Sequence, residues 1–142
     1  KDPKVEFGST FYYPYLSICT TGTHDMNPLR AWWEEDRGVT QRFYNHVLGA
    51  WGAAPYFCEP WICEQVVAMH LKSPAMLTVL PLQDWLAMDG GLRRENPHDE
   101  RINVPANSRH YWRYRMHFFL EELLEMDEFN KMISQKIAES GR

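Results

Sequence analysis

Residues 15–36 read YLSICTTGTHDMNPLRAWWEED, and this stretch decides how the chain folds. The apolar run from Tyr15 to Thr20 predicts a strand, and the uninterrupted run from Leu29 to Asp36 predicts a helix. Asn27 can cap this helix, and Pro28 suits its first position. The polar turn between the two elements therefore lies at the carboxyl end of a strand, where α/β enzymes place their catalytic groups.

His24 and Asp25 are the two groups in this turn that can carry chemistry. In a regular strand they would face opposite sides, so both can line one pocket only where the strand ends and the backbone turns. The nearby helix N-terminus favours an ionised Asp25. An ordinary strand–helix cap with a hydrogen-bonded histidine explains the same residues, and most unusual acids are structural.

The rest of the pattern predicts an α/β unit that is rich in helix. Apolar spacing predicts helices at Val39–Leu48 and Pro60–Lys72, with Gly38 ending the first helix and Gly49 ending the second. The apolar run Ala75–Leu80 lies between two prolines and suits a buried parallel strand. Two further helices follow Phe118, so we expect two short parallel strands with several helices.

A second polar pair, Gln83 and Asp84, follows this second strand as His24 and Asp25 follow the first. The carboxyl ends of parallel strands meet at one edge, so both pairs should face the same end of the sheet. Gln83 carries two donors and an acceptor and is the better candidate for binding the hydroxyl groups of a ligand. Asp84 can instead cap a short helix from Trp85 to Met88.

Three blocks of sequence resemble a known family. They are FYYPYLSICTTGTHDMNPLRAWWEED (residues 11–36), LPLQDWLA (80–87), and RINVP (101–105) followed by HYWRYR (110–115). Their content and order are similar to the 4-α-glucanotransferases, the amylomaltases and disproportionating enzymes, in particular the longer plant-type and Bacteroides-like branch. The resemblance covers roughly residues 1 to 117.

The resemblance implies retaining transfer of α-1,4-glucan on a (β/α)8 barrel. Retaining enzymes need a nucleophile and an acid/base carboxyl about 5–5.5 Å apart. The family adds a third carboxylate, which stabilises the transition state, and Asp25 matches it. His24 would contact hydroxyls of the same sugar, and Asn103 matches the substrate-lining Asn of the family's Arg-x-Asn-x-Pro motif.

The nucleophile and the acid/base of such enzymes are missing from this sequence. The family's nucleophile follows an Arg by two positions, and no Arg-x-Asp triplet ends a candidate strand here. A complete barrel needs about 250 residues. We expect residues 1–142 to form a single unit, the last two βα units of the barrel plus C-terminal helices. It would be inactive alone and would need the remainder of the catalytic barrel as its partner.

Six tryptophans are many for this length, and aromatic rings can stack on the faces of glucose units. Most such rings belong to cores. Trp32 and Trp112 are the two candidates for substrate binding, because they lie beside the motif blocks. The segment from Tyr111 to Met116 mixes aromatics with two arginines, which could suggest RNA binding, although a packed aromatic cluster with an arginine ion pair fits better.

Composition narrows the classes of function. The net charge of −4 and the scattered Lys and Arg residues give no argument for nucleic acid. No apolar run approaches the about 20 residues of a membrane span. The odd count of three cysteines suits free thiols in a reducing cytoplasm. Cys58, Cys63 and His70 match no structural zinc spacing, so no metal and no cofactor are expected.

Two other kinds of function remain open from the sequence. A non-catalytic glucan-binding module would act through Trp and Tyr, but such modules are usually β-sandwiches, and the helical periodicity argues against one. A structural or assembly domain would use apolar faces, and a barrel fragment with an uncovered core should oligomerise. Light scattering separates a monomeric module from an assembled fragment.

Overall fold

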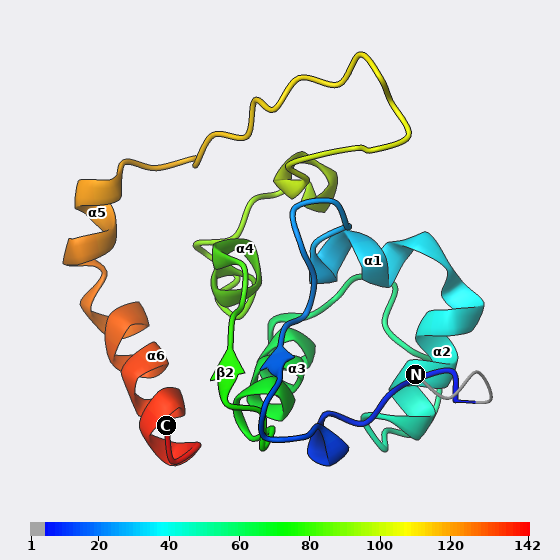
Figure 1. Ribbon diagram of the computed structural model, residues 1–142. Helices are drawn as coiled ribbons and strands as arrows, with labels where there is room; N and C mark the ends of the chain where they lie inside the picture. The colour runs from blue at the N-terminus through cyan, green and yellow to red at the C-terminus, as the bar shows by residue number, and fades with distance from the viewer. Residues whose placement is uncertain (1–4) are drawn as a thin grey trace.

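The computed structural model describes residues 5–142 of the chain and contains one small parallel sheet surrounded by helices (Figure 1). Strands β1 (Ile18–Cys19) and β2 (Leu77–Thr78) pair in parallel, with Ile18 opposite Leu77. Hydrogen bonds continue the pairing on both sides, from Met76 N to Tyr15 O (2.7 Å) and from Val79 N to Cys19 O (2.9 Å). The predicted parallel pairing is therefore confirmed, although each strand is shorter than its apolar run. The expected burial of the second strand is wrong, since Leu77 is 47% exposed.

The helices follow the predicted order. They are α1 (Leu29–Glu35), α2 (Arg37–His46), α3 (Pro60–Leu71), α4 (Leu82–Leu86), α5 (Leu120–Glu125) and α6 (Asp127–Glu139), with short 3₁₀ turns η1 (Thr10–Tyr12) and η2 (Pro97–Glu100). None of the helices in residues 5–142 combines the length and the apolar character that crossing a bilayer requires. The helix-rich α/β class predicted from the sequence is confirmed.

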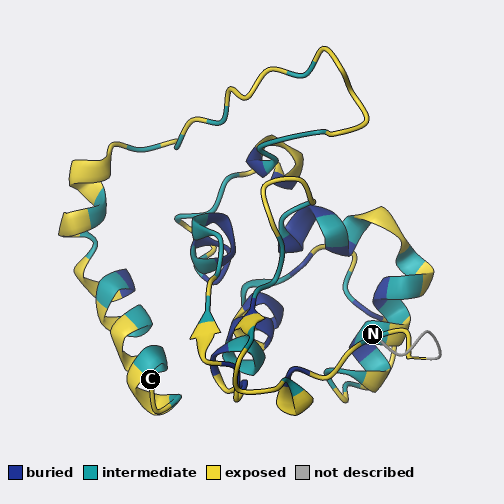
Figure 2. Ribbon diagram, viewed as in Figure 1, coloured by how far each residue is buried: buried dark blue, intermediate teal, exposed yellow. Residues whose placement is uncertain are grey.

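The core lies between α1, α2 and α3, where the buried residues gather in Figure 2. Trp33 is fully buried at its centre, and its indole Nε1 donates to Pro55 O at 3.0 Å. Thr40 of α2 donates its hydroxyl to Trp33 O (2.7 Å), which satisfies a carbonyl at the end of α1. This packing fixes α1 relative to the rest of the chain, and α1 directly follows the His24–Asp25 turn.

The boundary between the first two helices differs from the prediction. Gly38 does not end α1; it lies in the first turn of α2. Asp36 separates the two helices in an extended conformation, and its Oδ1 accepts hydrogen bonds from Gly38 N (2.8 Å) and Val39 N (3.0 Å). An aspartate cap is a stronger start signal than an isolated glycine is a stop signal, so α2 begins two residues earlier than expected.

The C-terminal third of the structure packs loosely on the rest and leaves many side chains exposed. After η2 the chain runs as a long coil around the molecule and returns as α5 and α6 (Figure 1), and α6 lies against α3. Lys136 of α6 pairs there with Glu64 of α3. Large apolar side chains at α5 are exposed, among them Leu120, Leu124 and Phe119, which immediately precedes the helix.

Candidate active site

The turn after β1 presents two of the predicted groups to solvent. Met26 N donates to Thr23 O (3.0 Å), which closes a tight turn around the His24–Asp25 pair. The side chains are about half exposed, 52% for His24 and 48% for Asp25, and His24 Nε2 lies 3.3 Å from Asp25 Oδ1. Their place at the carboxyl end of the strand agrees with the sequence prediction.

Asn103 joins this pair from a distant part of the sequence. Its side-chain Nδ2 donates to Asp25 Oδ1 at 2.6 Å, and its backbone N donates to His24 O at 3.0 Å. Two hydrogen bonds thus tie the coil after η2 to the turn after β1. The Asn103 amide occupies one oxygen of Asp25 and orients the carboxylate, since hydrogen bonds to a charged acceptor are strong and directional.

Trp112 completes the cluster on the other side of His24. The two rings lie with their centroids 5.0 Å apart and tilted by 44°. Trp112 remains 61% exposed, so most of its face is free. A carboxylate, an amide, an imidazole and an open indole face are therefore gathered at one end of the sheet, a set suited to hydroxylated ligands with apolar faces.

The remaining two predicted site residues lie apart from this cluster. Gln83 is buried, and its Nε2 donates to Glu100 O at 3.2 Å, although it lines a small cavity of about 30 Å³ together with His24. Trp32 packs edge-to-face on Phe43, with ring centroids 5.3 Å apart. It lines a different cavity of about 240 Å³, which also contacts Asn27.

Asp84 has a different role from the predicted cap of a Trp85–Met88 helix. Helix α4 starts earlier, at Leu82, so Asp84 lies inside it. Its carboxylate accepts a hydrogen bond from Leu29 N (3.0 Å) and a second one from the Thr21 hydroxyl. Asp84 therefore caps α1. Burial raises the pKa of its carboxyl group, while these two hydrogen bonds oppose the rise.

Asn27, the predicted cap of α1, makes no such bond, and Pro28 precedes the helix instead of starting it. The Asn27 side chain bonds to two other partners. Its Nδ2 donates to Glu35 Oε2 at 3.2 Å, and its Oδ1 accepts from Arg101 Nη1 at 2.8 Å. A local cap was predicted because the sequence cannot show that a carboxylate 55 residues away reaches the same amide.

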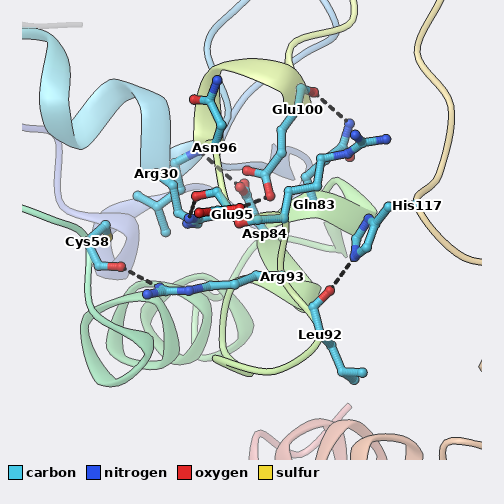
Figure 3. Close-up of polar contacts among 12 residues, drawn as sticks. Arg30, Cys58, Gln83, Asp84, Leu92, Arg93, Glu95, Asn96, Glu100 and His117 are labelled. Carbon is cyan, nitrogen blue, oxygen red and sulfur yellow. Dashed lines mark hydrogen bonds and ion pairs between the residues drawn. The ribbon is translucent and has the colours of Figure 1, made fainter.

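A buried ion pair joins α1 and η2 (Figure 3). Arg30 Nη1 of α1 lies 3.0 Å from Glu100 Oε1 of η2, and both side chains are at least 93% buried. Arg30 also donates to the carbonyls of Arg94 (2.7 Å) and Glu95 (3.3 Å). Burial raises the pKa of Glu100, and the Arg30 guanidinium opposes that rise. The pair fixes η2 on α1, and Asn103 is the third residue after η2.

Arg101 links the same segments on the exposed side. Its Nε donates to Asn103 O (2.9 Å) and its Nη1 to the side chain of Asn27. Arg101 thus connects Asn103 of the cluster with Asn27, which lies between the His24–Asp25 turn and α1. Neither this arginine nor the buried pair was singled out from the sequence. Arg101 is the first residue of the RINVP block, so this block could have pointed to it.

Sequence comparison now decides the family. The sequence model of the 4-alpha-glucanotransferases matches residues 1–121 of this chain. The chain belongs to the 4-alpha-glucanotransferase family. It is 38% identical over 141 residues to 4-alpha-glucanotransferase DPE2 of Oryza sativa subsp. japonica, covering 99% of the chain and 15% of that protein. It is 30% identical to the 4-alpha-glucanotransferase of Chlamydia caviae, covering 86% of the chain and 23% of that protein.

A solved structure agrees at the level of fold. The amylomaltase from Streptococcus agalactiae in complex with acarbose superimposes with a TM-score of 0.66 at 20% identity, over 92% of this chain and 23% of that protein. The glucanotransferase chain thus spans about 15–23% of the relatives that it matches. The resemblance seen in the sequence is confirmed.

The three cysteines of this glucanotransferase chain are free, as predicted, and all three are buried. Cys58 Sγ lies 3.4 Å from Cys63 Sγ, and the hydrogen bond between these thiols, together with burial, raises the pKa of Cys58. Within residues 5–142, no three His, Cys, Asp or Glu side chains are grouped so that they could hold a metal ion.

Replacing Arg101 with Ala in a complete glucanotransferase that carries this sequence should lower kcat for glucan transfer about 10- to 100-fold. The substitution releases Asn103 and Asn27 from their shared partner, and displacements near 1 Å at an active site cost about 100-fold. Arg101→Lys should behave like Ala, because an ammonium cannot reproduce the forked contacts. Steady-state kinetics on maltotriose measure the change. Arg109→Ala, at an exposed arginine of the same coil, provides the control. An unchanged kcat in Arg101→Ala would show that Arg101 does not position the site residues.

Proposed function

We propose that this chain is part of a 4-alpha-glucanotransferase that transfers α-1,4-glucan segments with retention of configuration. Family membership and the fold shared with an amylomaltase bound to acarbose support the proposal. One observation carries it: the side chain of Asn103 lies 2.6 Å from Asp25 Oδ1, although 78 residues separate them. Two residues that the resemblance assigns to the substrate site, one as transition-state stabiliser and one as substrate-lining, thus lie in hydrogen-bonding contact.

Asp25 is proposed as the carboxylate that stabilises the transition state. With one oxygen oriented by Asn103, the other can accept hydrogen bonds from sugar hydroxyls. If these bonds shorten as the oxocarbenium-like sugar forms, they stabilise the transition state more than the ground state, and this difference accelerates transfer. The nucleophile and the acid/base carboxyl would come from parts of the enzyme outside this chain.

The other site residues would bind the glucan. His24 lies beside Asp25 and can donate to a hydroxyl of the same sugar. Trp112 offers an open indole face on which a glucose ring can stack. Gln83 would contribute from the cavity next to His24, and Trp32 would meet a more distant glucose unit through the separate cavity that it lines.

The sheet supports the proposed place in a barrel. We assign β1 and β2 to the last two strands of a (β/α)8 barrel, with residues 1–142 acting as one unit, of which residues 1–4 lie outside the described part. Apolar strand residues are uncovered, among them Ile18 (57% exposed), Leu77 (47%) and Val79 (56%). The remainder of the barrel would cover them. Alone, the chain would hide them by forming oligomers. The free cysteines favour a cytoplasmic location.

Transfer assays on maltotriose test the proposal directly. A complete enzyme carrying this sequence should convert maltotriose into glucose and longer malto-oligosaccharides. The 142-residue chain should form no product under the same conditions, because it lacks the nucleophile and the acid/base. Chromatography of the products gives the readout. Transfer by the chain alone, or hydrolysis without transfer by the complete enzyme, would contradict the proposal.

Replacing Trp112 with Ala should raise KM for maltodextrin about 3- to 10-fold and leave kcat within about threefold. Loss of an aromatic contact costs about 0.5–1.5 kcal/mol. Stacking on a glucose ring makes the same contact in the ground state and in the transition state, so its loss mainly changes KM. Trp51, which is 94% exposed and lies outside the cluster, gives a matched control. An unchanged KM in Trp112→Ala together with a raised one in Trp51→Ala would reverse the assignment.

A further inference from the structure

We propose that Asp84 is a positioning residue that holds the His24–Asp25 turn in its working geometry by binding both ends of that turn. The inference rests on the proposed function of Asp25 and adds a residue to that site. Asp84 comes from α4, which follows β2, whereas the turn follows β1. A single carboxylate therefore connects the ends of two neighbouring strands.

Each carboxylate oxygen of Asp84 accepts a hydrogen bond from a different end of the turn. Oδ2 accepts a hydrogen bond from the hydroxyl of Thr21, which precedes the turn, and Oδ1 accepts one from the backbone N of Leu29, the first residue of α1. The seven residues between these contacts contain the His24–Asp25 pair. Holding both ends at one carboxylate fixes the span of the turn, and so limits where the carboxylate of Asp25 can lie.

Asp84 provides a rigid anchor. It is 99% buried, and its backbone N donates to Pro81 O at 3.0 Å in the first turn of α4. The neighbours Leu86 and Ala87 are fully packed. Asp84 is almost fully buried, and both of its carboxylate oxygens already accept hydrogen bonds, from Thr21 and from Leu29. We therefore expect its effect on catalysis to pass through the turn that these two residues flank.

Capping a helix with a buried carboxylate is energetically unfavourable, because the carboxylate loses its hydration when it is buried. A neutral local side chain such as Asn27 could accept a hydrogen bond from the Leu29 amide with a smaller desolvation cost. Asn27 is instead held by Arg101, and the amide is bound by a group from the neighbouring strand end. Precise placement of the turn explains this arrangement better than helix stability does.

Hydrogen exchange in the 142-residue chain tests the clamp without any activity. In Asp84→Ala the Leu29 amide loses its acceptor and should exchange at least about tenfold faster, together with the amides of residues 22–27. Asp84→Asn keeps an oxygen for Leu29 N and an amide that can donate to Thr21, so exchange should stay within about threefold of the unchanged chain. Equal protection of this turn in Asp84→Ala and the unchanged chain would overturn the clamp.

Kinetics of a complete enzyme carrying this sequence test the effect on the site. Asp84→Ala should lower kcat about 30- to 100-fold with KM within about threefold, and Asp84→Asn should recover kcat to within about fivefold. Asp36→Ala is the matched control, because it removes the equivalent cap of α2 far from the turn. It should lower stability and leave kcat unchanged.

Thermal unfolding shows whether each variant is folded at the assay temperature. If Asp84→Ala does not fold, Thr21→Val decides, since it removes only the Oδ2 contact and should still lower kcat. An unchanged kcat in the folded Asp84→Ala variant, or in Thr21→Val when Ala fails to fold, would overturn the proposal. Full activity of Asp25→Asn would instead reject the proposed function, and the exchange result would stand separately.

Discussion

Replacing Asp25 with Asn in a complete enzyme that carries this sequence should reduce kcat for maltotriose disproportionation at least about 100-fold. Losses of 100- to 1000-fold are typical when one group that stabilises the transition state is removed. The neutral amide keeps the shape of Asp25 but loses its charge, and one of its two hydrogen-bonding atoms becomes a donor. The contact with Asn103 Nδ2 would also depend on which atom faces it.

Initial rates of glucose release and product chromatography measure this effect. Asp99→Asn is a suitable control, since Asp99 is an exposed aspartate in η2 and the change in charge is identical. Melting temperatures of both variants should match that of the unchanged enzyme, because Asp25 is half exposed. If Asp25→Asn retained full activity, the assignment by resemblance would fail, and Asp25 would be an ordinary residue of a strand–helix turn.

Replacing Arg30 with Ala should lower the free energy of unfolding by about 3–5 kcal/mol, the cost typical of removing one partner of a buried ion pair. Glu100 would stay buried without its guanidinium partner, and the carbonyls of Arg94 and Glu95 would lose a donor. Because η2 is held on α1 by this pair, the coil that carries Asn103 should also become less protected against hydrogen exchange.

Urea unfolding followed by tryptophan fluorescence measures this loss. The double variant Arg30→Met with Glu100→Leu should be much more stable than Arg30→Ala, since apolar side chains of similar size can replace a buried pair at little cost. The exposed pair of Arg42 and Glu6 provides a control, and Arg42→Ala should barely change the midpoint. Equal stability of Arg30→Ala and the unchanged chain would show that the buried pair does not hold η2 on α1.

Much of the site could be predicted from the sequence, because its signals are local. The apolar run before Gly22 and the helix after Pro28 placed the His24–Asp25 turn at a strand end, and the pairing of β1 with β2 agrees. Asn103 and Trp112 came from sequence blocks whose family is now established, and both lie in the cluster. Gln83 and Trp32 came from the same kind of reasoning but lie outside it.

The tertiary structure decided which distant groups meet. Sequence patterns report which face of an element is apolar and where its backbone can turn, and these properties depend on neighbours within a few residues. The cap of α1 by Asp84, the burial of Arg30 with Glu100 and the reach of Arg101 join segments 55 to 74 residues apart. Such contacts depend on how the elements pack together. The sequence alone determined the strand ends and the carboxylate at the candidate site, and only folding determined what holds that carboxylate in place.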